Sequence, residues 1–447
     1  MTLLDDLLQH EAAPRWNHRA GDGLDDSDRA ALAELRLALS RQRIAWVPER
    51  PPEQILQWVE ERAAFVPSMR ARRPNGGAWR QQWSSVPTIA REDLALRPES
   101  LVPEDVDLDR MLVYRTAGTT GHALLVPHHA RAAGAYLPLM EVALRRHGAA
   151  IAPTGGRVAC FLVGAQVRTV TYPSLLTFWG GAGFAKINLQ ESEWRDPGDR
   201  GRFFEAWQPE LLTGDPISFA ELARLGIPCS PKAMITTAVA MSAGLRLKLE
   251  RRFRCPVIDW YSLTETGPIG FACPLGGGYH IVPHDLYVEV IDRRGTPLPP
   301  GGRGEVTVTG GRNRYLPLLR YRTGDWGRLE FSPCACGDPM PRLCDLEGRS
   351  PVLYRAASGS VVNPVDVSRV LRELPIVQHE LVQRRDGSCR ITARLVDPED
   401  VGRREEIELA LKQLFGDVSV EVVFDRELGQ RENGKVIPYR SELLLED

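Results

Sequence analysis

The feature that most limits the fold of this chain is an alternation of short β-rich runs with helical stretches, which begins at Met111. Branched and aromatic residues predict strands over 111–114, 157–163, 185–187, 232–235 and 256–260. Between them, apolar residues at three- and four-residue spacing predict helices over 219–225 and 242–253. Such alternation is typical of an α/β domain.

The sequence on either side of this stretch has a different pattern. The first hundred residues are expected to be mainly helical, with helices near 30–39 and 52–65. Residues 286–291 and 304–309 predict antiparallel strands joined through the turn residues that follow Ile291. Because a chain of 447 residues exceeds the size of one hydrophobic core, we predict two domains, over 1–348 and 349–447. The second is expected to be a small α+β unit.

Composition narrows the function classes. With 56 basic and 58 acidic residues, no global field attracts nucleic acid or an anionic membrane. The longest candidate apolar run, Val158–Val163, has the length of a strand and not of a membrane span. No cleavable signal pattern follows the acidic N-terminus. We therefore expect a soluble cytoplasmic protein whose partners include neither nucleic acid nor membrane.

Two motifs place an aromatic ring, hydroxyls and carboxylates after predicted strands. Tyr261 to Gly267 reads Tyr-Ser-Leu-Thr-Glu-Thr-Gly, and Tyr321 to Asp325 reads Tyr-Arg-Thr-Gly-Asp. A nucleotide site needs a flat face for the base, an acid for the ribose hydroxyls and an acid for magnesium, and we expect loops to present them. Taken singly, Tyr261 could be a core residue and Asp325 an ordinary turn acid.

A third motif, Thr116-Ala-Gly-Thr-Thr-Gly121, supplies small residues whose amides could cradle phosphates. It lies between 111–115 and 123–126, which predict a hairpin, and it lacks the Gly-Lys-Ser/Thr ending of a P-loop NTPase. On its own it could be a plain β-turn. The three motifs in this order indicate an enzyme that uses ATP.

This order, with the lead-in Val86–Leu94 and the dipeptides Gly348-Arg349 and Gly434-Lys435, resembles the acyl-adenylate-forming superfamily. Within it, the chain looks most like the phenylacetate–CoA ligase family, over roughly residues 80 to 440. The resemblance implies a large N-terminal α/β adenylation domain and a small, mobile C-terminal lid. It also implies ATP-dependent conversion of a carboxylic acid to an acyl adenylate, followed by transfer to the thiol of coenzyme A. Two alternatives stay open: loading of a carrier-protein phosphopantetheine, and a non-catalytic adenylate-binding scaffold.

The resemblance implies roles for individual residues. Lys435 would be catalytic, although alone it reads as a solvated turn lysine, and Glu265 would be catalytic and hold magnesium. Tyr261 would stack on adenine, and Asp325 would accept the ribose hydroxyls. The other implied nucleotide-binding residues are Thr116, Gly118, Thr119, Thr120, Gly121, Thr237, Asp259, Trp260, Thr264 and Arg349.

Three positions depart from the family's pattern. His122 stands where a lysine usually follows the phosphate loop, and Val239 stands where an acid usually lines the adenine site. Pro351 restricts the backbone after the hinge dipeptide. These departures could alter the substrate, the affinity for nucleotide or the second half-reaction.

Three of the eight cysteines and one histidine, all near the motifs, suggest a metal site. Cys334 and Cys336 form a two-thiol turn, and Cys273 and His280 flank a glycine-rich turn upstream. In a reducing compartment this set predicts a structural zinc site, with Cys344 as a spare ligand. The alternative is four unrelated residues.

The expected acid pocket is the aromatic, glycine-rich stretch from Tyr172 to Gly181, which includes Phe178 and Trp179. Apolar walls with a few polar groups suit an aryl or arylacetic acid, and a plain core role fits equally well. The expected small molecules are ATP, magnesium, a carboxylic acid and coenzyme A, or a carrier protein in place of coenzyme A. A homodimer is left open.

Overall fold

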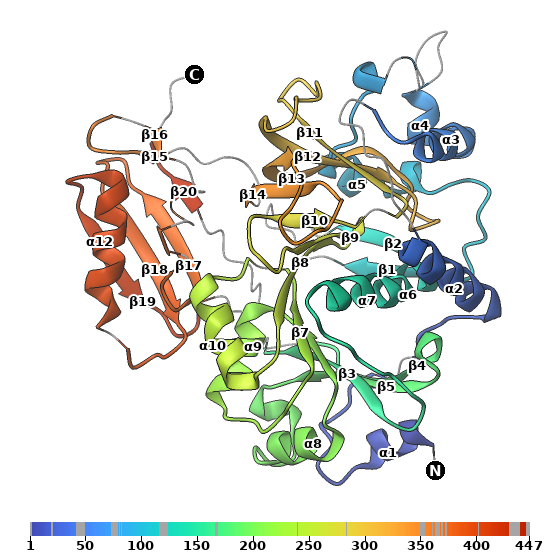
Figure 1. Ribbon diagram of the computed structural model, residues 1–447, viewed down its shortest axis with the longest axis horizontal. Helices are drawn as coiled ribbons and strands as arrows, with labels where there is room; N and C mark the ends of the chain where they lie inside the picture. Colours follow the sequence, from blue (N-terminus) through green and yellow to red (C-terminus); the bar gives the residue numbers. More distant parts are fainter. Residues whose placement is uncertain are drawn as a thin grey trace. The chain divides into compact units, whose positions relative to one another are not determined.

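The fold is described here from a computed structural model. The structure describes residues 2–18, 21–41, 50–72, 79, 81, 83–115, 124–165, 169–238, 240–282, 284–347, 354–359, 361–362, 367, 370–371, 373–400, 402–428 and 439–443. Contacts divide the chain into two compact units (Figure 1). Unit 1 comprises residues 1–21, 149–259 and 351–447, and unit 2 comprises residues 22–148 and 260–350. The domain boundary predicted at 348/349 lies outside the described residues.

Unit 1 contains the predicted α/β alternation. Its strand order is β8-β7-β6-β3-β5-β4, all parallel except β4 at the edge. Its strands and helices before the last hundred residues are α1 (Leu3–Gln9), β3 (Val158–Gly164), β4 (Tyr172–Leu176), η3 (Thr177–Trp179), β5 (Ala182–Asn188), η4 (Glu191–Glu193), α8 (Asp199–Trp207), β6 (Leu211–Gly214), α9 (Pro216–Arg224), β7 (Ala233–Thr236), α10 (Ala243–Phe253) and the first half of β8 (Val257–Leu263).

The parallel strands are apolar because helices cover them. Almost every residue of β3 is buried, as expected of a strand that is covered on both faces. Leu245, Leu249 and Phe253 follow one another at four-residue spacing on α10 and join the same core. Asp215 starts α9 by accepting a hydrogen bond from the Ser218 amide at 2.8 Å, a cap that contributes about 1 kcal/mol.

The C-terminal part of unit 1 has a core of its own. Its elements are β15 (Tyr354–Arg355), β16 (Val361–Val362), β17 (Ile376–Gln383), β18 (Cys389–Leu395), α12 (Arg403–Phe415), β19 (Val420–Phe424) and β20 (Tyr439–Ser441). The sheet has the order β19-β18-β17-β20, and α12 lies along it in Figure 1. Ile407, Leu411 and Phe415 of α12 pack on Leu381 and Ile391 of the sheet. Ser242, the N-cap of α10, donates to the Ile376 carbonyl at 2.8 Å and so links this part to α10.

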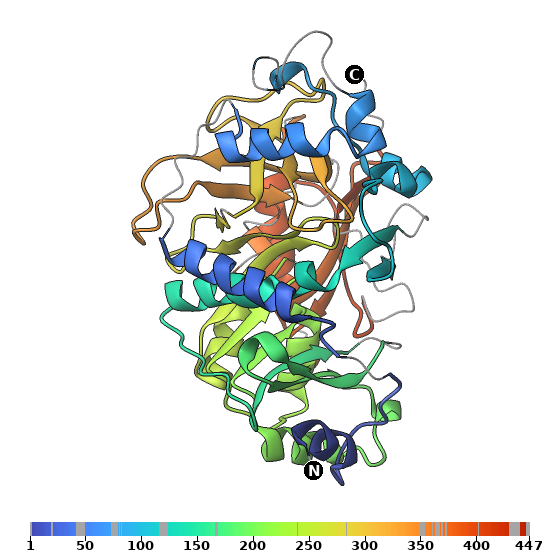
Figure 2. The same cartoon turned by 90° about the vertical axis from the view of Figure 1, so that its right-hand side faces the viewer.

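Unit 2 combines a helical N-terminal part with antiparallel strands. The helical and hairpin elements are α2 (Asp26–Arg41), α3 (Glu53–Arg62), α4 (Pro67–Ala71), η1 (Trp83–Ser85), α5 (Arg91–Leu96), η2 (Pro98–Leu101), β1 (Met111–Arg115), β2 (Leu125–His129), α6 (Ala130–Gly134) and α7 (Tyr136–Arg146). Figure 2 shows α2 lying along α7. The predicted hairpin is confirmed, because β1 and β2 pair antiparallel from Met111↔His129 to Arg115↔Leu125.

The antiparallel sheet of unit 2 holds the predicted motifs. Its order is β11-β12-β13-β14-β10-β9-β8. The strands are the second half of β8, β9 (Gly267–Ala272), β10 (Tyr279–Ile281), β11 (Leu286–Ile291), β12 (Arg303–Gly310), β13 (Leu318–Glu330) and β14 (Arg342–Glu347). The predicted pairing of 286–291 with 304–309 is confirmed by the register Leu286↔Gly310 to Ile291↔Glu305.

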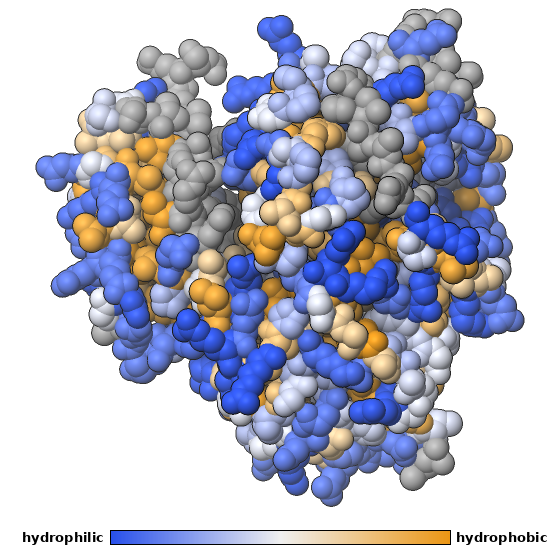
Figure 3. Space-filling view, in the orientation of Figure 1, coloured by the Kyte–Doolittle hydropathy of each residue, from blue (hydrophilic) through white to orange (hydrophobic). Residues whose placement is uncertain are grey.

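The surface is mainly polar on the face shown in Figure 3, with apolar side chains in small groups between charged ones. Within the described ranges, no helix is long and apolar enough to cross a membrane.

Candidate functional site

Tyr261 and Asp325 meet in unit 2, although 64 positions separate them in the chain. The Tyr261 hydroxyl donates to Oδ2 of Asp325 at 2.8 Å, and each residue is only 8% exposed. Burial, reinforced by the Asp325 charge, raises the pKa of Tyr261 well above its ordinary value. The phenol therefore stays a donor, and the ring and acid predicted to take the base and the ribose are neighbours.

The expectation that loops present these two residues is wrong. Tyr261 lies within β8, and Asp325 lies within the long strand β13. Asp325 is set apart by a bulge: Thr323, Gly324 and Asp325 stand opposite one residue of β12, between the pairs Thr307↔Arg322 and Glu305↔Trp326. Gly324 has φ +77°, and the Thr323 hydroxyl accepts from the Asp325 amide at 3.1 Å. Asp325 therefore lies at a bulge within a strand and not on a loop.

Glu265 follows β8 and is buried, at 4% exposure. Its Oε1 accepts from Nη1 of Arg91 at 2.7 Å and from the Tyr321 hydroxyl at 3.0 Å. Burial raises the pKa of Tyr321 well above its ordinary value, so this phenol is also a donor. Carboxylate oxygen is the ligand type that magnesium prefers, and a nucleotide's phosphates supply further oxygens, so the residue fits the metal role. Arg91, Tyr261, Glu265, Tyr321 and Asp325 are called the carboxylate site below.

Arg91 and Tyr321 were not assigned a role from the sequence. Both belong to segments that carry the resemblance, yet Arg91 is 174 positions from Glu265. Nothing in the local pattern indicates which carboxylate they would contact.

Unit 1 holds two more of the predicted nucleotide-binding residues at its parallel strands. Thr237 directly follows β7, and its amide donates to the Gly214 carbonyl at 3.0 Å. Asp259 lies on β8, where its Oδ1 accepts from the Thr236 hydroxyl at 3.3 Å. Ala238 has φ +74°, a conformation rare outside glycine, so this turn is strained.

The remaining predicted residues of the nucleotide site are distributed as follows. Trp260 is buried at 3% exposure in β8, and Thr264 is half-buried in the turn before Glu265. The phosphate loop 116–121, His122, Val239, Arg349, Pro351 and Lys435 lie outside the described residues, and their roles stay predictions.

The expected acid pocket is divided between a strand and a short helix of unit 1. Tyr172 opens β4, and its ring lies 6.1 Å from the ring of His18 and 6.0 Å from that of Phe184. Trp179 is buried at 3% exposure, whereas Tyr172 and Phe178 are half-buried. The predicted stretch is aromatic, and Trp179 is as buried as a core residue.

The four predicted zinc ligands converge in unit 2. One ligand atom from each of Cys273, His280, Cys334 and Cys336 lies within 4.8 Å of all the others. Zinc lies about 2.0–2.3 Å from its nitrogen and sulfur ligands, so two ligand atoms of one zinc ion lie at most about twice that distance apart. Three thiols and one imidazole, gathered in this way, therefore fit zinc. These four residues are called the sulfur cluster below. Cys344, the spare ligand, instead donates its thiol to the Gly277 carbonyl at 3.1 Å.

Local backbone geometry explains why the sulfur cluster forms. Cys273 directly follows β9, and a glycine turn returns the chain to His280 on β10, with the Cys273 amide donating to the Gly278 carbonyl at 2.9 Å. A Cβ on Gly278 would lie 2.8 Å from Sγ of Cys344, so only glycine fits. Nε2 of His280 lies 3.1 Å from Sγ of Cys336. Nδ1 of His280 faces the Met340 carbonyl at 3.4 Å, and such outer contacts fix the orientation of a metal-binding ring.

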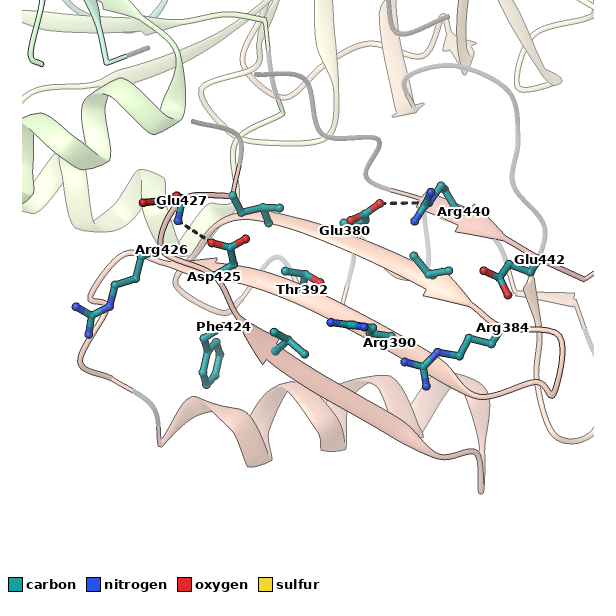
Figure 4. A pocket seen from close by; sticks show the side chains of 13 residues that line it. Glu380, Arg384, Arg390, Thr392, Phe424, Asp425, Arg426, Glu427, Arg440 and Glu442 are labelled. Atoms are coloured by element: carbon teal, nitrogen blue, oxygen red, sulfur yellow. Dashed lines mark hydrogen bonds and ion pairs between the residues drawn. The ribbon is translucent and has the colours of Figure 1, made fainter. Parts of the chain in front are cut away.

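A separate cavity of about 620 Å³ opens on the C-terminal sheet (Figure 4). Its lining carries four arginines and four carboxylates, so the charges balance. Arg440 and Glu380 face each other there, with Nε and Oε1 3.2 Å apart. This balance does not favour a strongly anionic ligand such as ATP.

Comparison with known proteins identifies the fold. The chain is similar to a solved 2-hydroxyisobutyryl-CoA ligase in the postadenylation state, with a TM-score of 0.59, 17% identity, and coverage of 93% of this chain and 89% of the other. The chain has the fold of acyl-adenylate-forming CoA ligases.

Curated relatives match parts of the sequence. A phenylacetate–coenzyme A ligase of Aromatoleum evansii is 31% identical over 211 residues, which cover 44% of this chain and 47% of the relative. One of Thermus thermophilus is 36% identical over 114 residues, which cover 25% of each chain. The chain thus spans less than half the length of these curated relatives. No protein-family model matches it.

Proposed function

We propose that this chain is an ATP-dependent acid–thiol ligase. In the first step an oxygen of the acid's carboxylate attacks the α-phosphorus of ATP, and pyrophosphate leaves. In the second step the thiol of coenzyme A attacks the acyl carbon of the adenylate, AMP leaves, and the thiol proton is released. The observation that carries the proposal is the pairing of Tyr261 with Asp325, beside a buried Glu265, in a chain with this fold.

The carboxylate site has the chemistry that the first step needs. Phosphoryl transfer depends mainly on positioning and on neutralising charge. Asp325 would accept ribose hydroxyls, the Tyr261 ring would stack on adenine, and Glu265 would hold the magnesium of MgATP. When bound, magnesium would neutralise phosphate charge and orient the phosphates.

We place Lys435 at the first step only. Its positive charge would lie between the substrate carboxylate and the α-phosphate, which otherwise repel each other. The C-terminal domain that carries it has a separate core and would act as a lid, turning away to admit the thiol.

The proposed substrate is an aryl or arylacetic acid. The phenylacetate–coenzyme A ligases among the relatives support this class, as does the aromatic stretch from Tyr172 to Trp179. We further propose that the sulfur cluster binds zinc in a structural role, and that the enzyme works in the reducing cytoplasm, where its thiols stay free.

The experiment that tests the proposal is pyrophosphate release with ATP, magnesium and a panel of aliphatic, aryl and arylacetic acids, with and without coenzyme A. We expect release to require an aromatic acid and to yield AMP and a thioester only when coenzyme A is present. Release without thioester, restored by a holo carrier protein, would favour carrier loading. No release with any acid would favour the non-catalytic scaffold.

A further inference from the structure

Arg91 stands at the start of α5, in a segment that is fixed to β13. The Ile89 amide donates to the Arg320 carbonyl at 3.1 Å, and the Arg322 amide donates to the Ile89 carbonyl at 2.8 Å. The Arg320 guanidinium is itself buried and donates to the Val86 carbonyl at 2.6 Å. The backbone that leads into Arg91 is therefore held from two directions.

The Arg91 guanidinium reaches from this segment to Glu265. Nη1 of Arg91 lies 2.7 Å from Oε1 of Glu265, with the two side chains 18% and 4% exposed. The Tyr321 hydroxyl donates to the same oxygen at 3.0 Å. Both contacts end on Oε1, and Oε2 takes part in neither. A buried carboxylate needs such partners, because an unpaired charge in the interior is strongly destabilising.

We propose that Arg91 is a positioning residue for the metal carboxylate. It fixes Glu265 through Oε1, together with Tyr321, and so orients Oε2 toward the divalent cation of MgATP. The inference rests on the proposed function, because it deepens the role assigned to Glu265.

The direction in which the metal affinity changes when Arg91 is replaced distinguishes positioning of Glu265 from competition with the metal. A partner that fixes one oxygen of a ligating carboxylate strengthens metal binding, and loss of such an outer contact typically costs about 10–100-fold in metal affinity. A guanidinium that merely occupied the metal's place would do the opposite, since its removal would free Glu265 for the cation.

The test is binding of Mn²⁺ to the full-length protein with ATP and no acid, followed by electron paramagnetic resonance. We compare the wild type with Arg91→Gln, Arg91→Lys and the control Arg97→Gln, which alters an exposed arginine just after the same helix. Arg91→Gln should weaken nucleotide-dependent Mn²⁺ binding by about tenfold or more, Arg91→Lys should recover part of the loss, and Arg97→Gln should match the wild type. Thermal unfolding of each variant in the absence of metal shows whether the fold is intact.

Each other outcome overturns the inference. Unchanged Mn²⁺ binding by Arg91→Gln means that the contact is only structural, and tighter binding means that Arg91 competes with the metal. An equal loss with lysine and glutamine means that damage to the segment, and not the charge, is responsible. Because no acid is present, the result is independent of whether any acid is adenylated, so failure of the proposed function is recognised separately by the pyrophosphate assay. Absence of nucleotide-dependent Mn²⁺ binding by the wild type would overturn both.

Discussion

The carboxylate site and the sulfur cluster lie in the same unit, yet they satisfy their polar groups differently. Glu265 and Asp325 already have protein partners, from Arg91, Tyr321 and Tyr261. The sulfur cluster brings three thiols and one imidazole together, and Sγ of Cys273 lies 3.6 Å from Sγ of Cys334, a weak contact between thiols. The carboxylates therefore have partners within the protein, whereas the thiols and imidazole of the sulfur cluster would obtain theirs from the proposed zinc ion. From this difference we expect the sulfur cluster, and not the carboxylate site, to need its metal for folding.

The largest expected effect is on the sulfur cluster. Cys336→Ser should remove about one zinc per chain and lower the free energy of unfolding by about 4 kcal/mol or more, the range of lost metal sites. Elemental analysis of protein purified without added metal and thermal unfolding measure the two quantities. The matched control is Cys344→Ser, since Cys344 is adjacent but outside the cluster. If both variants keep their metal content and stability, the cluster holds no structural zinc.

The second largest effect is expected on the magnesium requirement and not on the stability of the fold. Glu265→Gln keeps the size of the side chain but removes its charge, so the magnesium concentration for half-maximal pyrophosphate release should rise by about 100-fold. Glu221→Gln, which breaks an ion pair with Arg224 on α9, should leave the magnesium requirement unchanged. A large loss of stability with an unchanged requirement would reverse the comparison between the two sites.

A smaller effect is expected at the ribose position. Asp325→Asn loses the charge and one acceptor, so the KM for ATP should rise by about tenfold, equivalent to one hydrogen bond to a charged group. Tyr261→Phe keeps the ring and should raise this KM by less. Steady-state kinetics with saturating acid measure both. A greater change in kcat than in KM would show that Asp325 does not act in nucleotide binding.

The sequence predicts those parts of the fold that depend on local pattern. The hairpin of β11 and β12 was predicted because its connection contains residues typical of turns. Oδ1 of Asp292 accepts from the Arg294 and Thr296 amides, each at 2.8 Å. Strand β4 was missed because Pro173 and Ser174 interrupt its apolar pattern, and β6 was missed because only two of its four residues, Leu211 and Leu212, are apolar.

In the candidate site too, the features that depend on local sequence were predicted and those that depend on tertiary packing were not. The sulfur cluster was predicted because its ligands come in two closely spaced pairs, each on one turn. The bulge at Gly324 and the contact of Arg91 with Glu265 could not be predicted, because both depend on how distant strands pair. Residue type thus predicted a chemistry for the site, and only tertiary structure revealed how each carboxylate is held.

The measurement that tests the central claim most directly follows oxygen from acid to nucleotide. The best acid of the panel is labelled with ¹⁸O in both carboxylate oxygens and incubated with the enzyme, ATP and coenzyme A. The masses of the products are then measured by mass spectrometry. Attack of the carboxylate on the α-phosphorus predicts AMP that carries one ¹⁸O, with unlabelled pyrophosphate. Unlabelled AMP, or label in pyrophosphate or inorganic phosphate, would contradict formation of an acyl adenylate.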